Sequence, residues 1–409
     1  MMRVAVTGFG VVSPIGIGQE AFWAALRNGH SGIGPISHFD CSGLDVRLAG
    51  EVREAIEMPE SAMAIAGDDP KVGFAYAACR EALSQAGISR LGAGCLLHLG
   101  ASLEVFPWAR AFAGATAGLA AVAERLGRFK LPLDSAVSLI GESFGRPAQA
   151  LTNCSACAAG SQAIGHAFRA IRSGRYAVAL CGGFDSMLNV MGVAGFQALG
   201  ALTLDNERGA HACRPFDAGR GGTVLGEGAA ALVLEPLEKA QAEGRRVLGE
   251  ICGYGSSLDA HHPSAPDANG SGAARAMAGA LADAGIEPAA VSHINAHGTG
   301  TRLNDEIEAV AIRRVFAGCW QRIPVSATKS MTGHLIAAAG AVEAGACLLA
   351  TTQGWLPPNP SLDAVGARCE LCHVVGEAAR FRGEYAMSNS FGFGGQNASL
   401  VFRRIDGTW

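Results

Sequence analysis

Residues 148–172, AQALTNCSACAAGSQAIGHAFRAIR, predict a β-strand that turns directly into an α-helix. The first six of these residues can form the strand. The apolar positions that follow recur at helical spacing until Gly174 ends the helix: Ile164, Ala167, Phe168 and Ile171. Cys157 falls at the junction, where the positive end of the helix dipole favours a thiolate and should lower the thiol pKa. Free backbone N–H groups at the same place can stabilise an oxyanion. The alternative is a buried structural cysteine.

Short β-like runs alternate with alanine-rich helical runs along the chain, which predicts an α/β architecture. The expected strands are Val4–Thr7, Cys95–Leu99, Tyr176–Cys181, Ala230–Leu234, Val291–Ala296, Ile323–Ala327 and Ser399–Arg403. The expected helices are Val72–Ala86, Ala158–Arg172, Gly272–Ala284, Glu306–Phe316 and Leu335–Thr352. A weak echo links Thr7–Gly10 with Cys252–Gly255, which is compatible with a duplicated fold. The charged segment Glu238–Arg246 marks the expected internal boundary.

Composition limits the classes of function. The chain has 409 residues, 49% hydrophobic and 17% charged, so it can bury a large core and offer a sizeable surface to another subunit. Its net charge of −4 argues against general nucleic-acid binding. We find no targeting signal, and the uncharged apolar-rich stretch at residues 111–123 is too short to cross a bilayer. We therefore expect a cytoplasmic protein, not associated with a membrane, whose 12 cysteines are reduced.

Three motifs resemble cofactor sites and have simpler explanations. Gly8-Phe9-Gly10 follows a strand but lacks the third glycine of a dinucleotide-binding turn, because Ser13 occupies that position. Residues 369–373 have the spacing of a haem attachment site, but nothing directs export, so core cysteines are expected there. Cys154 and Cys157 have CxxC spacing without the context of a redox or zinc site. We therefore expect neither a bound cofactor nor a metal.

Two histidines lie in loops between a strand and a helix, where active groups gather in open α/β sheets. His297 lies in the run Asn295–Thr301, and Asn304 is expected to cap the helix that follows. His334 ends the run Lys329–His334, again between a strand and a helix. Two such histidines together with a cysteine at a helix start are a much rarer coincidence than one.

A fourth loop, Asn389–Gly395, places glycines beside two phenylalanines. Such a loop can turn tightly and can move. It is either a plain hairpin or a gate over an apolar cavity.

These four loops, in this order and spacing, make the chain similar to the elongating β-ketoacyl-[acyl carrier protein] synthases of fatty acid and type II polyketide synthesis. The resemblance covers nearly the whole chain. It implies an α/β, thiolase-like duplicated fold with five layers, α-β-α-β-α. Residues 1–245 would form the half that carries the nucleophile, and residues 246–409 the half with both histidines and the gating loop.

The resemblance assigns catalytic roles to Cys157, His297, His334 and Lys329, and a supporting role to Glu308. Cys157 is the nucleophile, and His297 and His334 form the histidine pair. Lys329 and Glu308 match the pair that braces the histidines.

The resemblance also implies a supporting role for Asp305 and substrate-binding roles for Thr299, Thr301, Phe391 and Phe393. Asp305 matches an acidic residue of the same loop, and Thr299 and Thr301 match threonines that meet the pantetheine arm. Phe391 belongs to the aromatic loop. Phe393 matches a gating phenylalanine whose backbone N–H joins that of Cys157 in an oxyanion hole.

The implied reaction is a decarboxylative Claisen condensation of a cysteine-bound acyl chain with malonyl-acyl carrier protein. Two histidine donors suit an enolate better than one, which favours this chemistry. Substrates would arrive on the phosphopantetheine of the carrier, and the enzyme would form a homodimer, or a heterodimer with a ketosynthase-like partner. One alternative is a non-catalytic partner resembling a chain-length factor. A more distant one is an NAD-dependent oxidoreductase.

Departures from the family pattern make a specialised polyketide or unusual-lipid pathway an alternative to ordinary fatty acid synthesis. Bulky residues follow Gly100, where Phe106 and Trp108 either shape an acyl cleft or simply pack in the core. The family's basic helix face is reduced to Lys71. A cluster of basic residues could replace it as the carrier-binding surface, or could be a solvated helix end: Arg125, Arg128 and Lys130.

Overall fold

The main sheet of the computed structural model follows one hydrogen-bonded path, in the order β13-β11-β10-β15-β16-β9-β1-β8-β7-β5-β6, with β2 paired to β1. Separate pairs of short strands are β3 (Ile33–Pro35) with β4 (Leu48–Gly50), and β12 (Trp355–Leu356) with β14 (Ala379–Arg380). The structure describes all residues except 1, 59, 61–68, 103–134 and 406–409. Five residues with predicted roles lie outside this described part: Phe106, Trp108, Arg125, Arg128 and Lys130.

Within the described part, the strands of the path are β1 (Val4–Ser13), β2 (Gly16–Ile17), β5 (Cys95–Gly100), β6 (Gln149–Asn153), β7 (Val178–Asp185), β8 (Gly228–Pro236), β9 (Gly249–Leu258), β10 (Val291–Asn295), β11 (Pro324–Ser326), β13 (Cys372–His373), β15 (Tyr385–Gly392) and β16 (Gln396–Arg403). Its α-helices are α1 (Gln19–Arg27), α3 (Pro70–Gln85), α6 (Ser135–Phe144), α7 (Ala159–Arg172), α8 (Val190–Ala198), α9 (Leu237–Ala242), α10 (Ser271–Ala284), α11 (Arg302–Val315), α12 (Lys329–Thr332) and α13 (Ala339–Gln353).

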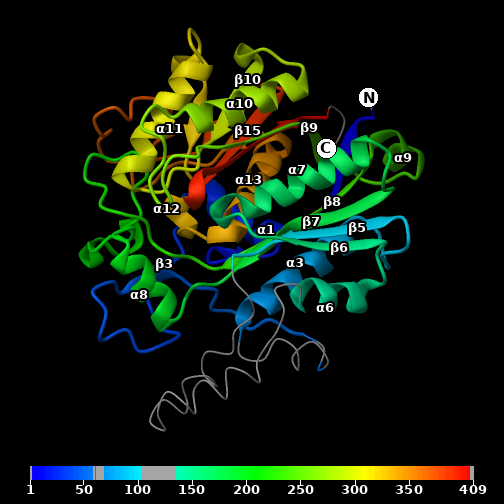
Figure 1. Cartoon of the computed structure of the whole chain (residues 1–409), viewed down its shortest axis with the longest axis horizontal. Helices are drawn as coiled ribbons and strands as arrows, with labels where there is room; N and C mark the ends of the chain where they lie inside the picture. The colour runs from blue at the N-terminus through cyan, green and yellow to red at the C-terminus, as the bar shows by residue number, and fades with distance from the viewer. Residues whose placement is uncertain (1, 59, 61–68, 103–134, 406–409) are drawn as a thin grey trace.

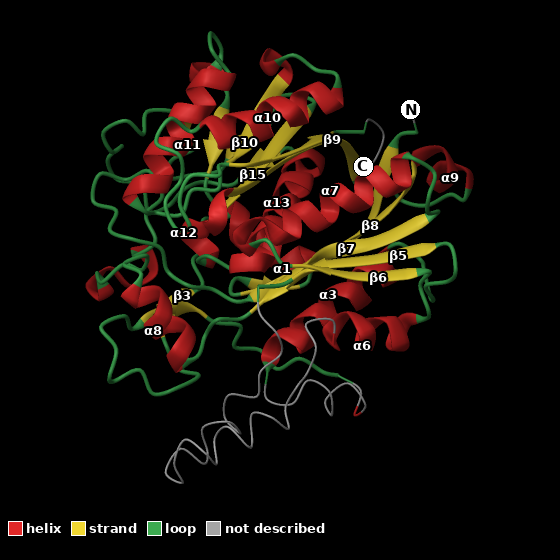
Figure 2. Cartoon of the chain, viewed as in Figure 1, coloured by secondary structure: helices red, strands yellow, loops and turns green. Residues whose placement is uncertain are grey.

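The path divides into two halves that meet at β1 and β9. β1 pairs with β9 only from Val4 to Val6, whereas it pairs with β8 from Val4 to Val12. Helices α3 and α6 cover one half, α10 and α11 cover the other, and α7 and α13 lie between the two (Figures 1 and 2). These layers confirm the predicted α-β-α-β-α fold. The boundary we predict at residue 245 lies between α9 and β9.

The two similar segments, Thr7–Gly10 and Cys252–Gly255, place their glycines at equivalent positions in the two halves. A Cβ on Gly10 of β1 would lie 2.1 Å from the carbonyl oxygen of Ala78 in α3. One on Gly255 of β9 would lie 2.1 Å from the carbonyl oxygen of Ala276 in α10. Each strand therefore needs glycine so that an outer helix can lie against its backbone. This contact also explains the Gly8-Phe9-Gly10 run, which lies within a strand rather than in a phosphate-binding turn.

The aromatic residue between each pair of glycines packs on the opposite face, toward the middle layer. Phe9 lies over Gly345 of α13, where an added Cβ would be 2.1 Å from the ring. Tyr254 lies over Gly165 of α7, where that distance would be 2.3 Å. The stretch Ile336–Gln353 has the length and hydropathy of a membrane span, but 89% of it is buried in this layer. Its apolar composition therefore reflects its place between two sheets.

Most expected elements are present with shifted ends. Helix α11 begins at Arg302 instead of Glu306, and the helix expected from Leu335 begins with a 3₁₀ turn, Ile336–Ala338, before α13. The interpretation of Lys71 as the remnant of a basic surface is wrong. Its side chain is 3% exposed, and its Nζ lies 3.2 Å from Asp69 Oδ2.

All twelve cysteines are free thiols. Cys369 is fully buried, and the His373 ring lies 2.8 Å from its carbonyl oxygen, so the haem-like motif is part of the core. Cys154 is exposed, whereas Cys157 is buried, which separates the two members of the other CxxC motif.

Candidate active site

Cys157 stands between β6 and α7, as the sequence predicts. It lies in a 3₁₀ turn, Ala156–Ala158, directly before α7. Ala156 has a left-handed backbone with φ of +48°, which is strained for a residue with a Cβ. Gly392 approaches from the aromatic loop, where a Cβ would lie 3.0 Å from the Cys157 nitrogen. The nucleophile candidate is therefore enclosed by backbone, and it is only 4% exposed.

Burial raises the pKa of the Cys157 thiol to about 11. Lys329 and the backbone N–H groups of Phe393 and Cys157 act in the opposite direction. The prediction of a lowered pKa is therefore wrong for the free protein, because desolvation of the thiolate outweighs these favourable contacts. The N–H of Phe393 nevertheless points at the sulfur, which is the position that the oxyanion-hole prediction requires.

His297 follows β10 in a loop whose backbone is held by α11. The carboxylate of Glu308 accepts the N–H groups of His297 and Gly298, each at 2.8 Å. Lys329 Nζ lies 2.5 Å from the His297 carbonyl oxygen and 3.2 Å from its Nδ1. Because an ammonium group only donates, Nδ1 accepts and Nε2 carries the ring proton.

Lys329 forms its ion pair with Glu343, a residue outside the predicted motifs, while Lys329 and Glu308 both contact the His297 loop, as the bracing prediction requires. Its Nζ lies 2.5 Å from Glu343 Oε1, and the two side chains are 1% and 3% exposed. Burial raises the pKa of Glu343 to about 7, against the effect of Lys329. Glu308 therefore fixes the loop backbone, and Glu343 compensates the buried ammonium. The sequence did carry a signal, since Glu343 is the single charged residue between positions 335 and 352.

His334 is fixed by the backbone that follows it. Its Nδ1 lies 3.1 Å from the nitrogen of Ile336, two residues further on. Ile336 has a φ of +49°, a conformation that is a clear outlier for a β-branched residue. A backbone N–H only donates, so Nδ1 of His334 accepts and Nε2 carries the proton, as in His297.

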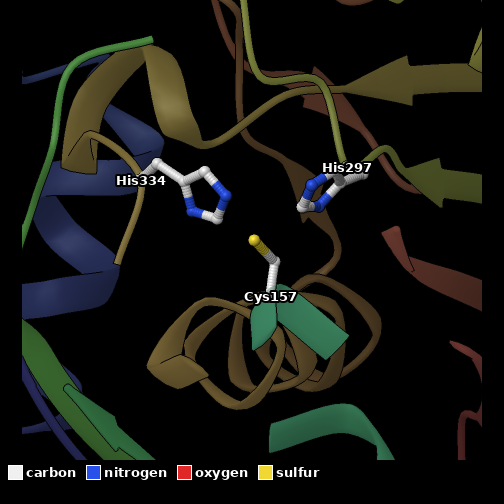
Figure 3. A group of neighbouring side chains, drawn as sticks. All are labelled: Cys157, His297 and His334. Carbon is white, nitrogen blue, oxygen red and sulfur yellow. The ribbon is translucent and has the colours of Figure 1, made fainter. Parts of the chain in front are cut away.

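The Cys157 side chain points between the two histidine rings (Figure 3). One nitrogen of each ring and the sulfur all lie within 4.8 Å of one another. The rings meet edge to face, with centroids 5.2 Å apart and planes at 82°. Burial, followed by Lys329, lowers the pKa of His297 and His334 well below the usual value, so both rings are neutral at pH 7.

The ring contacts of these histidines do not fit a metal site. A histidine that binds a metal through Nε2 usually donates its Nδ1 proton to a neighbour. Here each Nδ1 instead receives a donor, from Lys329 or from Ile336. Both rings therefore present an N–H group to whatever binds beside Cys157.

Asp305 holds the section of the loop after His297. Its Oδ1 accepts the N–H groups of Thr299 and Gly300, at 3.0 and 3.3 Å. The hydroxyls of Thr299 and Thr301 lie 2.9 Å apart. Thr301 is also the N-cap of α11, because its hydroxyl accepts the N–H of Asn304 at 3.3 Å. The prediction that Asn304 caps this helix is therefore wrong.

A cavity of about 470 Å³ contains most of the predicted site residues. Its lining includes Cys157, His297, Thr299, Thr301, His334, Phe391 and Phe393. Lys329, Glu308 and Asp305 lie behind this lining. The Phe391 ring lies 6.1 Å from that of His297, and Phe393 stacks on Phe196 of α8 at 6.3 Å. Leu303 also lines the cavity and is 59% exposed, so the cavity opens at the surface beside α11.

The aromatic loop is the end of a hairpin. Strands β15 and β16 pair as far as Gly392 and Gln396, and Phe393–Gly395 closes the turn. This confirms the hairpin, whereas movement of Phe393 as a gate remains a prediction.

Two family descriptions match the chain. Residues 1–240 match the beta-ketoacyl synthase N-terminal domain, and residues 248–363 match the beta-ketoacyl synthase C-terminal domain. The chain is 39% identical to the 3-oxoacyl-[acyl-carrier-protein] synthase 2 of Synechocystis sp., with 98% of each protein covered. It is 36% identical to the synthase of the same name from Coxiella burnetii, with 98% of this chain and 99% of the relative covered.

Solved structures of ketosynthases are also similar to this chain. A beta-ketoacyl synthase from Burkholderia phymatum superposes with a TM-score of 0.89 at 35% identity, covering 99% of this chain and 100% of that one. The ishigamide ketosynthase/chain length factor gives 0.88 at 36% identity, with 99% of each chain covered. A type II polyketide synthase acyl-carrier protein in complex with its ketosynthase gives 0.88 at 29% identity, covering 99% of this chain and 100% of that one.

Proposed function

The chain belongs to the beta-ketoacyl synthase family, and we propose that it joins an acyl chain held on Cys157 to a malonyl unit delivered by an acyl carrier protein. The enzyme is an acyltransferase of the 3-oxoacyl-[acyl-carrier-protein] synthase type. His297 and His334 are the donors for the malonyl carbonyl. Lys329, Glu343, Glu308 and Asp305 hold them and their loop in place.

The assignment of His297 and His334 as hydrogen-bond donors rests on the contacts of their Nδ1 atoms. Both histidines accept a hydrogen bond at Nδ1, from Lys329 and from the Ile336 backbone, so both keep their proton at Nε2. Two fixed N–H donors beside a cysteine suit an oxygen that becomes negative when carbon dioxide leaves a malonyl thioester. The same two rings are poorly suited to act as bases, because their accessible nitrogens already carry protons.

Acyl transfer comes first. The sulfur of Cys157 attacks the carbonyl carbon of the incoming thioester, a new C–S bond forms, and the bond to the pantetheine sulfur breaks. The proton of the buried thiol ends on the released pantetheine thiol. The N–H groups of Cys157 and Phe393 would hold the intermediate oxyanion.

Condensation follows on the malonyl thioester. Its carboxylate leaves as carbon dioxide, and the electron pair of the broken C–C bond becomes an enolate held by the Nε2–H groups of His297 and His334. The enolate carbon attacks the acyl carbonyl on Cys157. Collapse of that intermediate releases the 3-oxoacyl carrier and a Cys157 thiolate, which takes a proton from solvent. These steps require no redox or metal cofactor. The phosphopantetheine that brings each substrate is part of the carrier.

The cavity gives the carrier's arm a route to the sulfur. Thr299 and Thr301 line it between Leu303 at the surface and His297, so their hydroxyls are placed to meet the amides of the pantetheine. A cytoplasmic location suits a soluble carrier. Nucleic acid and membrane have no part in this reaction.

A homodimer fits the sheet. Among the residues that the structure describes, strand β6 ends the strand path, and four of its side chains are half-buried: Gln149, Leu151, Thr152 and Asn153. An open edge of this kind can pair with the same edge of a second copy across a twofold axis. Light scattering of the purified chain gives its mass, and co-expression with a ketosynthase-like protein tests the heterodimer.

The experiment that tests the function separates its two steps. Incubation with an acyl-loaded carrier protein should add the acyl mass to Cys157 and not to Cys154, and fragmentation of the peptide that contains both cysteines identifies the modified one. Release of carbon dioxide from malonyl carrier should fall about 10²–10³-fold in His297→Ala and in His334→Ala, with a smaller effect on acylation. A chain-length-factor-like partner would show neither acylation nor release. Full condensation by Cys157→Ala would refute the proposal.

A further inference from the structure

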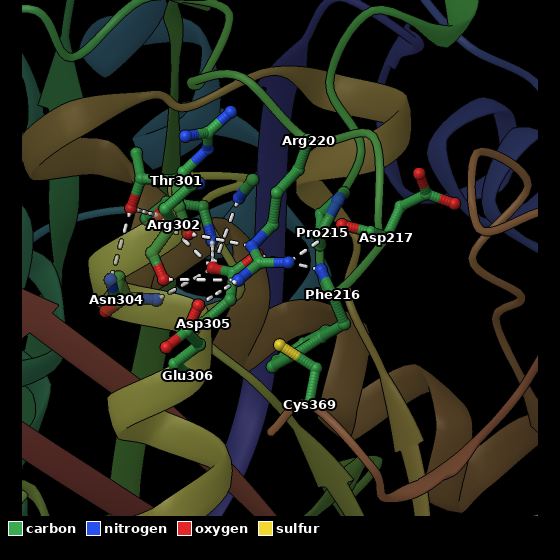
Figure 4. A network of polar contacts seen from close by, with 12 residues as sticks. Pro215, Phe216, Asp217, Arg220, Thr301, Arg302, Asn304, Asp305, Glu306 and Cys369 are labelled. Carbon is green, nitrogen blue, oxygen red and sulfur yellow. Dashed lines mark hydrogen bonds and ion pairs between the residues drawn. The ribbon is translucent and has the colours of Figure 1, made fainter. Parts of the chain in front are cut away.

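Arg220 packs against the beginning of α11, and all three of its guanidinium nitrogens donate hydrogen bonds (Figure 4). Nε donates to the carbonyl oxygen of Thr301 at 3.3 Å, and Nη1 donates to that of Asp217 at 2.9 Å. Nη2 donates to the carbonyl oxygen of Arg302 at 3.3 Å and to Glu306 Oε1 at 2.9 Å. The side chain is 5% exposed, so these contacts are shielded from water.

Arg220 and Asp305 hold the same section of loop through opposite groups. Asp305 accepts the N–H groups of Thr299 and Gly300, and its other oxygen lies 3.8 Å from Arg220 Nε. Arg220 holds the carbonyl oxygen of Thr301, the residue that caps α11. The short segment that carries both cavity-lining threonines is therefore fixed at its N–H groups and at its carbonyl groups.

The loop from His297 to Thr301 is thus held in two sections. Glu308 accepts the N–H groups of His297 and Gly298, which fixes the section with the enolate donor. Asp305 and Arg220 fix the next section, which ends at Thr301. The two carboxylates are three residues apart on α11, so one helix face accepts four consecutive N–H groups.

We propose that Arg220 is a positioning residue for the carrier's arm: through Thr299 and Thr301 it sets the affinity for pantetheine-borne substrates and leaves the chemistry at His297 unchanged. This inference rests on the proposed function. Its chemical basis is the planar guanidinium fork, which reaches several acceptors at fixed angles, whereas a lysine ammonium is a single point charge on a flexible stem. Arg220→Lys keeps the charge but cannot keep that geometry.

The test compares Arg220→Lys with Glu308→Gln as a matched pair, one variant for each section of the loop. The assay is release of carbon dioxide from malonyl-pantetheine, with the rate of Cys157 alkylation as a separate measure of the nucleophile. We expect Arg220→Lys to raise KM about tenfold, with kcat within about threefold of the parent, since one charge-assisted hydrogen bond is worth about that factor. Glu308→Gln should lower kcat with a smaller change in KM.

Hydrogen exchange gives a second readout. In Arg220→Lys, the peptide covering 299–304 should exchange faster, while the peptide covering 291–298 keeps its protection. If Arg220→Lys does not fold, Glu306→Ala removes one hydrogen-bond acceptor of the guanidinium at a partly exposed site, and the same peptide should exchange faster.

Three results would overturn the inference: an unchanged KM, a fall in kcat like that of Glu308→Gln, or faster exchange spread over the whole chain. Failure of the proposed function has a different signature, because the parent enzyme would then release no carbon dioxide at all.

Discussion

Ala156 and Ile336 have the same left-handed backbone, with φ of +48° and +49°, at equivalent points of the two halves. Each opens a 3₁₀ turn that continues into a helix of the middle layer, α7 or α13. Each is followed four residues later by a glycine, Gly160 or Gly340, at which the other helix crosses closely. The same backbone turn therefore occurs once in each half of the duplicated fold.

The two copies of this turn serve the active site in different ways. In the first, the residue after the left-handed one is Cys157. In the second, the left-handed residue itself, Ile336, aims its N–H at Nδ1 of His334. Duplication of one backbone turn thus supplies both the nucleophile and the contact that fixes the proton of one donor.

The strain at Ala156 can be measured. Glycine adopts a left-handed backbone without the Cβ penalty, but it also costs entropy in the unfolded chain. These terms nearly cancel at Ala156, so Ala156→Gly should change the free energy of unfolding by less than about 0.5 kcal/mol. Ala158→Gly, at φ −90°, has no strain to relieve and should cost about 1 kcal/mol. Urea denaturation of both variants checks this, and equal losses would mean that Ala156 is not strained.

The close contact of β1 with α3 gives a second prediction. A Cβ at Gly10 would lie 2.1 Å from the Ala78 carbonyl oxygen, and backbone cannot move aside cheaply. Gly10→Ala should therefore lower the free energy of unfolding by about 3 kcal/mol. Gly195 of α8 is the control, since no heavy atom lies within 4 Å of its added Cβ. Gly195→Ala should be neutral or stabilising by about 1 kcal/mol, because alanine favours the helix. Similar losses in both variants would contradict the packing argument.

Glu343 should control the histidine pair through Lys329. In Glu343→Gln the buried ammonium loses its counter-charge, and burial then favours the neutral amine. A neutral amine can accept a proton as well as donate one, so His297 is no longer restricted to the Nε2–H form. We expect release of carbon dioxide to slow by about 10²-fold, with alkylation of Cys157 little changed. Glu238→Gln, at the surface helix α9, is the matched control. A Glu343→Gln enzyme with normal decarboxylation would refute this role.

Much of this site could be predicted because its residues lie in local patterns. Cys157 sits at a strand-to-helix turn, and His297 and His334 each follow a strand, so the ends of the strands bring them together. The duplicated fold left a visible trace for the same reason: the glycines of β1 and β9 meet the same packing requirement.

The parts that could not be predicted depend on distant neighbours. Lys329 pairs with Glu343, which lies 14 positions further along the chain in α13 and belongs to none of the four loops that the sequence singles out. Arg220 lies some 80 positions before the loop it holds, with no repeat or motif to link them. The pKa of Cys157 depends on how completely the thiol is buried, which the position of a helix start does not reveal.

The pH dependence of Cys157 alkylation shows which of two opposing effects on the thiol pKa is larger, burial or the nearby positive charge. A helix N-terminus and Lys329 favour the thiolate, and burial opposes it, with a resulting pKa of about 11. Only the thiolate reacts with iodoacetamide, and its fraction rises about tenfold per pH unit below the pKa. The alkylation rate should therefore keep rising between about pH 7 and pH 9.5, without a plateau. Fragmentation of the labelled peptide, which contains both cysteines, assigns the label to Cys157 or to the exposed Cys154, and Cys157→Ser gives the background. A rate that levels off below about pH 8 would mean that the helix terminus and the cation outweigh burial, and that the free enzyme already holds a thiolate.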